Sequence, residues 1–231
     1  MRFAGAALVL ALLPARQGAA QAATTMYPGM APLAQYLMPR DAEIALARSA
    51  APASVSRDAA ILVLTRSGFQ MAIAGTNGFV CLVARSWSAD YDAPDFWNPR
   101  VRAPNCYNAA AARSQVAETR KRTQVVLAGG SRAEVADSVK AAIESGELPT
   151  AEVGAMSYML SPGAYLSRRD GRWLPHLMFY LSGTAPGAWG AGLPGSPILA
   201  FPYPDERLTV FIVPVGRWSD GTPAGSRERG H

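Results

Sequence analysis

The chain has 231 residues, of which 49% are hydrophobic and 17% are charged, and its formal net charge is +5. This composition is typical of a globular protein and excludes a chain that is disordered along most of its length. A net charge this small does not indicate binding to DNA or RNA, so we predict no nucleic-acid partner.

The first 22 residues have the pattern of a secretory signal peptide. Arg2 precedes an apolar run from Phe3 to Leu13, and a small-residue stretch ends at Ala20-Gln21-Ala22. We expect cleavage after Ala22, which lowers the net charge to +3 because Arg2 and Arg16 are removed. The apolar run is shorter than the roughly 20 residues that span a bilayer, so we expect no membrane span in the mature chain. The predicted location is therefore periplasmic or secreted.

The next part of the chain predicts one helix and three strands. Residues 23–38 are rich in Pro, Gly and Met and are expected to cover the surface, whereas residues 40–50 have helical spacing between two prolines. Three strand-like runs follow, at 60–65, 69–74 and 79–85. Asn77-Gly78 lies between the last two and is the strongest short hairpin signal. We therefore predict an antiparallel meander.

Cys81 and Cys106 are the two cysteines of the sequence. An even number of cysteines in an exported chain favours a disulfide, and the alternative is two free, buried thiols. A bridge that closes a loop of about 26 residues stabilises the folded state by roughly 3 to 4 kcal/mol. It would pin the irregular segment before Cys106 to the sheet and remove both sulfur atoms as nucleophiles or metal ligands.

The middle of the chain predicts a long loop and two helices. Prolines interrupt any periodicity between Trp87 and Pro104, which indicates a loop, and long loops are often functional. Asn108 can cap a helix that continues to about Leu127. Ser131 and Glu134 form a capping box for a second helix that ends near Gly146.

The last third predicts strands at 154–160, 176–181 and 208–215, with a segment rich in Gly and Pro at 183–204. The element order predicts an α+β fold with an antiparallel sheet and helices packed on one face. It also permits the layout of PAS-like or profilin-like domains. We expect a single domain over 23–218 and a disordered tail over 219–231.

Several segments of the sequence resemble a group of small secreted bacterial proteins of uncharacterised function. The segments are Gly75-Thr76-Asn77-Gly78-Phe79-Val80-Cys81-Leu82-Val83, Pro175-His176-Leu177-Met178-Phe179-Tyr180 and Pro214-Val215-Gly216-Arg217-Trp218-Ser219-Asp220-Gly221. Shorter ones are Phe96-Trp97-Asn98-Pro99, Asn105-Cys106-Tyr107 and Tyr158-Met159-Leu160-Ser161. The resemblance implies export and a single folded unit, and it implies no activity and no site residue.

His176 is the best candidate for a catalytic residue. His231 is the last residue of the sequence, which leaves one histidine within the predicted domain. Imidazole titrates near neutral pH and is the usual general acid or base. In a strand His176, Met178 and Tyr180 share one face. The simpler alternative is a histidine at a strand edge that binds a backbone carbonyl.

A copper site is a weaker alternative for this region. Met156, Met159, His176 and Met178 could supply the soft ligands that Cu(I) prefers. Met156 and Met159 point to opposite faces of one strand, however, so all four cannot converge. Methionine also commonly fills gaps in cores. We therefore predict no cofactor and no metal.

The loop at 87–99 combines acidic and aromatic residues. Carboxylates suit calcium, and aromatic faces beside hydrogen-bonding groups suit a small ligand or sugar, although the EF-hand glycine and glutamate are missing. The alternative is a solvated loop that tucks Trp97 into the core. The predicted ligand-binding residues are Trp87, Asp90, Tyr91, Asp92, Asp95, Trp97, Tyr158, His176 and Tyr180.

Two functional hypotheses follow. The first is a non-catalytic domain that binds a small molecule or a cell-envelope component, with the loop 87–99 and the segment 183–197 flanking a shallow cleft. The second is a hydrolase-type enzyme that uses His176 as general base, although its sequence lacks the Gly-x-Ser-x-Gly nucleophile pattern. The sequence gives no ligand and no oligomeric state.

Overall fold

The computed structural model describes residues 27–225, so the predicted signal peptide at 1–22 lies outside the described residues. The helices and short helical turns are η1 (Leu33–Gln35), α1 (Arg40–Arg48), α2 (Ala53–Ser56), η2 (Ser86–Ser88), α3 (Ala109–Ala111), η3 (Ala112–Val116), α4 (Ala117–Leu127), α5 (Arg132–Glu144), η4 (Pro186–Trp189) and η5 (Pro204–Glu206). The strands are β1 (Ala60–Thr65), β2 (Gly68–Ile73), β3 (Val80–Ala84), β4 (Ala103–Tyr107), β5 (Met156–Met159), β6 (His176–Ser182), β7 (Leu199–Tyr203) and β8 (Leu208–Pro214).

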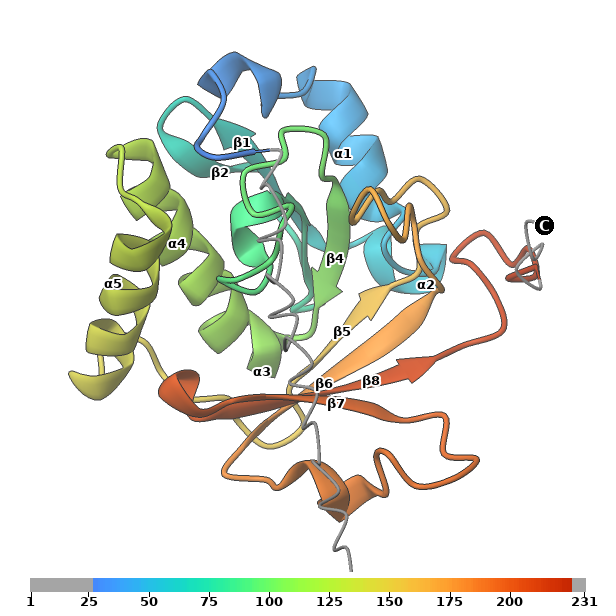
Figure 1. The fold of residues 1–231 in the computed structure, drawn as a ribbon. Coiled ribbons are helices and arrows are strands. Elements are labelled where there is room, and N and C mark those ends of the chain that lie inside the picture. The colour runs from blue at the N-terminus through green and yellow to red at the C-terminus, as the bar shows by residue number, and fades with distance from the viewer. Residues whose placement is uncertain (1–26, 226–231) are drawn as a thin grey trace, which may run out of the picture.

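Within the described residues the strands form one eight-stranded sheet in the order β2-β1-β3-β4-β5-β6-β8-β7. Neighbouring strands are antiparallel except for β1 and β3, which are parallel. The predicted α+β fold is therefore confirmed, with a mixed, mostly antiparallel sheet. Figure 1 shows that the sheet turns along its length, so that β4 and the β8–β7 end run in clearly different directions. None of the helices within 27–225 is both long and apolar enough to cross a bilayer.

The predicted antiparallel meander is wrong between β2 and β3. The chain does not turn back at Asn77-Gly78 to pair β3 with β2, because it crosses the start of β1 and places β3 on the other side. Gly75 passes so close to β1 that a Cβ there would lie 2.1 Å from the backbone nitrogen of Ala60. The side chain of Asn77 holds the crossing by donating to the carbonyl of Val55 and accepting from the backbone N–H of Phe79.

The predicted disulfide joins Cys81 of β3 to Cys106 of β4, with an S–S distance of 1.97 Å. The two residues are direct partners in the antiparallel register. Cys106 thus lies in a strand, β4, that the sequence did not predict because prolines precede it. Pro104 is tolerated there because β5 pairs with β4 only at Cys106 and Tyr107, so no strand on that side needs an N–H from residue 104.

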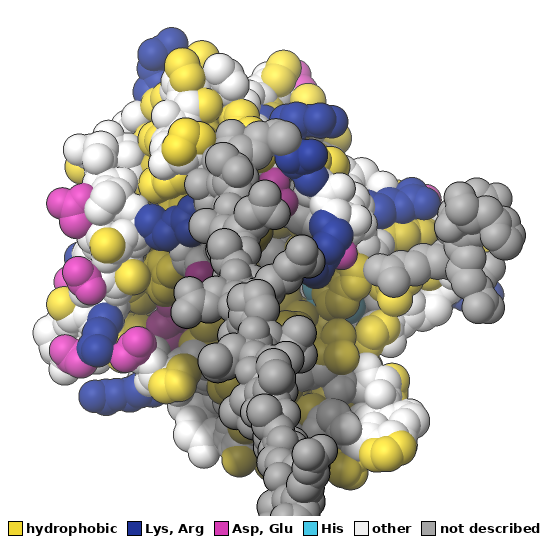
Figure 2. Space-filling view, in the orientation of Figure 1, with side chains coloured by type: hydrophobic (Ala, Val, Ile, Leu, Met, Phe, Trp, Pro, Cys, Tyr) yellow, Lys and Arg dark blue, Asp and Glu magenta, His cyan; other side chains and the backbone are white. Residues whose placement is uncertain are grey.

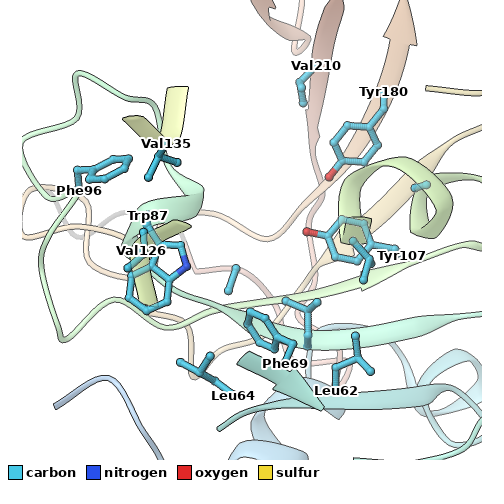
Figure 3. Packing of buried hydrophobic residues seen from close by; sticks show 14 of the residues in the cluster. Leu62, Leu64, Phe69, Trp87, Phe96, Tyr107, Val126, Val135, Tyr180 and Val210 are labelled. Atoms are coloured by element: carbon cyan, nitrogen blue, oxygen red, sulfur yellow. The ribbon is translucent and has the colours of Figure 1, made fainter. Parts of the chain in front are cut away.

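Helices cover both faces of the sheet rather than one face as expected. Side chains alternate along β1, so consecutive residues enter different clusters. Ile61 packs in a cluster with Ile44 of α1, whereas Leu62 packs in a cluster with Val126 of α4. Figure 3 shows the second cluster, which fills the space between the sheet and the α4 and α5 helices.

The two predicted helices of the middle segment are confirmed with their caps. The side chain of Asn108 accepts a hydrogen bond from the backbone N–H of Ala111 at 2.9 Å. Ser131 and Glu134 form the expected capping box of α5. The first of these helices also contains a π-helical turn, η3, between α3 and α4, which the sequence did not predict. π-helical turns are rare in proteins, and those that occur are often found at functional sites.

The segment rich in Gly and Pro contains a strand, β7, that the sequence did not predict. Trp189 of η4 stacks on Phe211 with ring centroids 4.6 Å apart and also lies against Phe179. The beginning of the predicted disordered tail is held in place, since Ser219 donates to the carbonyl of Leu160 and Ala224 donates to that of Gly216. Residues 226–231 lie outside the described residues.

Candidate functional site

The candidate site is a pocket of about 370 Å³ on the α4 side of the sheet, which residues of several strands and of α4 line together. Its lining strands include β4 and the β8–β7 end, between which the sheet turns in Figure 1. Residues from β4, β5, β6, β7, β8 and α4 line it, together with the loop that follows η2. The turned sheet and α4 therefore supply much of the pocket wall.

Most of the wall is apolar or aromatic. The strand period points Met178 and Tyr180 of β6 to this face, and the register places them beside Ile212 and Val210 of β8. Phe201 of β7 pairs with Val210 and extends the same face to the sheet edge, where it is 38% exposed. A small organic molecule in this pocket would contact mainly apolar side chains.

Buried hydroxyl groups border the inner part of the pocket. Tyr180 Oη lies 2.9 Å from Ser157 Oγ, which donates to Asn105 Oδ1 at 3.2 Å. Figure 3 shows the phenol oxygens of Tyr107 and Tyr180 pointing to the same side of the cluster. Burial raises the pKa of both tyrosines above the ordinary value of 10.0. Both phenols are therefore neutral hydrogen-bonding groups at physiological pH.

Charged residues gather at the α4 end of the pocket around Arg122. Its guanidinium donates to Glu118 and Glu206, each at 2.7 Å, and to the carbonyls of Trp87 and Ala89. It also lies over the ring of Tyr91, 4.3 Å from the centroid. All three charged side chains are largely buried. One guanidinium therefore serves two carboxylates and holds the loop after η2 against α4.

The two acids share one cation in a buried site, and the pKa of Glu206 is strongly shifted there. Burial first, and then the negative charge of Glu118, raise the pKa of Glu206 to about 7 against the lowering effect of Arg122. Burial alone would lower the pKa of Arg122, but the two carboxylates raise it above its ordinary value. Arg122 is therefore charged throughout the physiological range, while Glu206 titrates near neutral pH.

The acidic loop reaches the sheet edge through a single hydrogen bond. Tyr203 of β7 donates from its hydroxyl to Asp90 Oδ1 at 2.6 Å. Burial, followed by the bond to Asp90, raises the pKa of Tyr203 well above the ordinary 10.0. This contact joins residues 113 positions apart and closes the pocket between the loop and β7.

His176 lines the pocket and pairs with Pro214 at the end of β8 that lies away from Glu206, the partner of Arg122, and it is 2% exposed. Its Nδ1 lies 2.7 Å from the carbonyl oxygen of Leu174, and its ring is 4.7 Å from that of Trp173. Burial lowers its pKa below 6.5, so the imidazole is neutral at pH 7. The expected shared face of His176, Met178 and Tyr180 is confirmed. The expected alternative, a bond to a backbone carbonyl, is also present.

The structure brings only part of the predicted set together. Asp90, His176 and Tyr180 line the pocket, and Tyr91 contacts Arg122 beside it. The other aromatic residues lie elsewhere: Trp87 and Trp97 are buried in the core, and Tyr158 points to the α1 side, where its ring faces Phe79.

The acidic residues of the loop do not converge. Asp92 is exposed, and Asp95 accepts hydrogen bonds from the side chain of Asn98 and the backbone of Arg168. Within 27–225 no three His, Cys, Asp or Glu side chains are grouped to hold a metal ion. The segment 183–197 does not flank the pocket either, because Trp189 anchors it on the opposite face of β6 and β8.

Among the pocket residues that were not predicted are three charged residues and a tyrosine that close its α4 end: Glu118, Arg122, Tyr203 and Glu206. The sequence carried one signal for the first two, since glutamate and arginine four positions apart on a helix form an ion pair. On the described part of the face in Figure 2, arginine and lysine side chains are scattered among acidic and hydrophobic ones and form no continuous basic surface.

No family model, no curated protein and no solved structure matches the chain. The pocket is therefore interpreted from its own geometry and chemistry.

Proposed function

We propose that the protein is exported and acts as a non-catalytic binding domain for a small, largely apolar molecule, or for the apolar part of a cell-envelope component. The pocket of about 370 Å³ is the observation that carries this proposal. Small-molecule sites in proteins have volumes of roughly 300 to 1,000 Å³ and combine apolar walls with a few fixed polar groups. The wall of Met178, Val210, Ile212 and Phe201, with Tyr180 and Glu206 as polar groups, fits that pattern.

The state of the polar groups favours binding over catalysis. Arg122 is saturated by two carboxylates and two carbonyls, and Asp90 is held by Tyr203. His176 binds a carbonyl rather than a carboxylate through Nδ1. Catalytic pairs of nucleophile and base are normally within hydrogen-bond reach, and no such pair that includes His176 is present in residues 27–225.

The disulfide supports export, because such bonds persist mainly in oxidising compartments. The signal-peptide pattern of residues 1–22 points the same way. A periplasmic or secreted protein meets ligands that have crossed, or belong to, the cell envelope. An apolar pocket suits that setting.

A fluorescent probe tests the pocket directly. N-phenyl-1-naphthylamine, which brightens in apolar surroundings, should bind the wild-type protein saturably with one site per chain. Phe201→Ala removes part of the wall and should weaken binding by about five- to tenfold, because a half-buried phenylalanine contributes on the order of 1 kcal/mol. Leu199→Ala is the matched control, since Leu199 lies on the same face of β7 and has similar exposure but does not line the pocket.

The proposal fails if the probe shows no saturable binding and if aliphatic and aromatic alcohols leave the melting temperature unchanged. A bound ligand necessarily raises the melting temperature of the folded state. Equal weakening by the Phe201 and Leu199 variants would place the probe on the outer surface of β7 rather than in the pocket.

A hydrolase that uses His176 as general base is our second proposal. One observation favours it: the imidazole lines the pocket, and its Nε2 makes no hydrogen bond to any residue within 27–225. Hydrolysis of p-nitrophenyl esters that is saturable and lost in His176→Gln would favour this proposal over the first. The probe titration described above does not depend on that outcome.

A further inference from the structure

Three side chains with soft or borderline ligand atoms lie together on one wall of the pocket: Met159, His176 and Met178. Met159 of β5 is the direct partner of His176 of β6. Met178 follows His176 by two residues and therefore projects from the same face. Directly opposite residues have Cβ atoms about 4.5 to 5.5 Å apart, and diagonal neighbours about 7 to 8 Å, which long side chains can bridge.

The imidazole is arranged as a ligand. Histidines that bind metals commonly donate from the other ring nitrogen to a carbonyl or carboxylate, which fixes the tautomer and the ring orientation. His176 makes this contact through Nδ1 to the carbonyl of Leu174. Its Nε2 then carries the free lone pair and makes no hydrogen bond to any described residue. The ring is almost completely buried, so its orientation is fixed before any ion arrives.

The sulfur atoms are also available. Met178 Sδ accepts a weak hydrogen bond from Tyr180 Oη at 3.8 Å, which leaves a second lone pair on the sulfur. Met159 is half-buried at the pocket surface. Met178 is partly buried and packs against the edge of the cluster on this face, and it lines the pocket as Met159 does.

We propose that Met159, His176 and Met178 form a binding site for a soft monovalent cation, Cu(I). Thioether sulfur and neutral imidazole nitrogen select Cu(I), whereas Mg²⁺ and Ca²⁺ require oxygen ligands. The carboxylates of the pocket are engaged at its other end by Arg122 and Tyr203. Met156, the fourth soft ligand considered from the sequence, points to the opposite face of β5 and is excluded.

The surroundings of the imidazole carry no charge. The groups that face it are the ring of Trp173 and the side chains of Met159 and Met178, none of which carries a charge. This site goes beyond the proposed binding of an organic molecule, because it uses one wall of the pocket and needs no second ligand.

An anaerobic competition between the protein and the chromogenic chelator bicinchoninate measures Cu(I) affinity. The wild-type protein should remove one equivalent of Cu(I) from the chelator. Met159→Leu and Met178→Leu should each weaken Cu(I) binding by about tenfold or more, the scale seen when supports of a metal site are lost. His176→Gln should weaken it most. Met156→Leu is the matched control on the same strand, and His231→Gln tests the other histidine, so both should bind as the wild type does.

The proposal is overturned if the wild type does not compete for Cu(I), or if Met156→Leu or His231→Gln loses as much affinity as the three pocket variants. Binding of N-phenyl-1-naphthylamine by the same samples shows whether each variant keeps a folded pocket. A protein that binds the probe but not Cu(I) refutes the metal site and leaves the proposed function standing. A protein that binds Cu(I) but not the probe supports the metal site and refutes the proposed binding of an apolar molecule.

Discussion

The most informative residues of the pocket are those whose charge depends on a distant partner. Glu206 meets Arg122 across 84 positions of sequence, and the contact holds the carboxyl in a buried site beside Glu118. Its pKa of about 7 in the folded state lies above the ordinary value of 4.5, chiefly because the group is buried. The folded state therefore binds a proton more tightly than the unfolded state, and this proton contributes stability that is lost as the pH rises.

The sign of this effect can be measured. Between pH 4.5 and about 7 the folded protein keeps a proton on Glu206 that the unfolded chain has released, so stability decreases as pH increases in this window. Glu206→Gln cannot ionise and should lack this loss. Relative to wild type, the free energy of unfolding of the variant should improve by roughly 2 to 3 kcal/mol from pH 5 to pH 8. Urea denaturation at the two pH values provides the measurement, and a difference that stays constant or falls would refute it.

Residue patterns predicted one end of the pocket and not the other. The alternation of a strand was enough to place His176, Met178 and Tyr180 on one face. Tyr203 and Glu206 could not be found in this way, because their roles depend on β7 pairing with β8 at the far edge of the sheet. The strand β7 was not predicted, because the prolines in and around it are not typical of a strand.

At the scale of elements, local signals located most strands and helices but not their neighbours. The two caps at Asn108 and Ser131 are local hydrogen bonds, so the sequence was sufficient to predict them. The placement of β3 beside β1 rather than β2 depends on a tight crossing near Gly75. No short pattern distinguishes that crossing from the hairpin that Asn77-Gly78 suggested.

Gly75→Ala should therefore destabilise the fold although the position is exposed. A Cβ at residue 75 would lie 2.1 Å from the backbone nitrogen of Ala60, and backbone cannot move aside as a flexible side chain can. We expect a loss of about 3 kcal/mol in the free energy of unfolding, at the upper end of overpacking effects. Gly187→Ala, where nothing lies within 4 Å of the added carbon, is the control and should change stability little. Similar denaturation midpoints for both variants would contradict the crossing.

For the whole molecule, element order was enough to predict an α+β fold, whereas the pocket could not be foreseen. The pocket is lined by strands on both sides of the turn of the sheet between β4 and β8 (Figure 1) and by α4, and Arg122 links α4 to Glu206 at its end. The disulfide between β3 and β4 stabilises the half of the sheet against which this closure forms. These features depend on residues that are far apart in the sequence, so no local pattern predicts them.

The most direct test of the account is methyl NMR of the methionines during titration with N-phenyl-1-naphthylamine. Met159 and Met178 line the pocket, Met156 points away from it, and Met71 is 62% exposed on β2 at the other end of the sheet. The account predicts that the methyl signals of Met159 and Met178 shift with the same saturation curve while those of Met156 and Met71 stay in place. Saturable binding that shifts Met71 or Met156 and leaves Met159 and Met178 unchanged would contradict it.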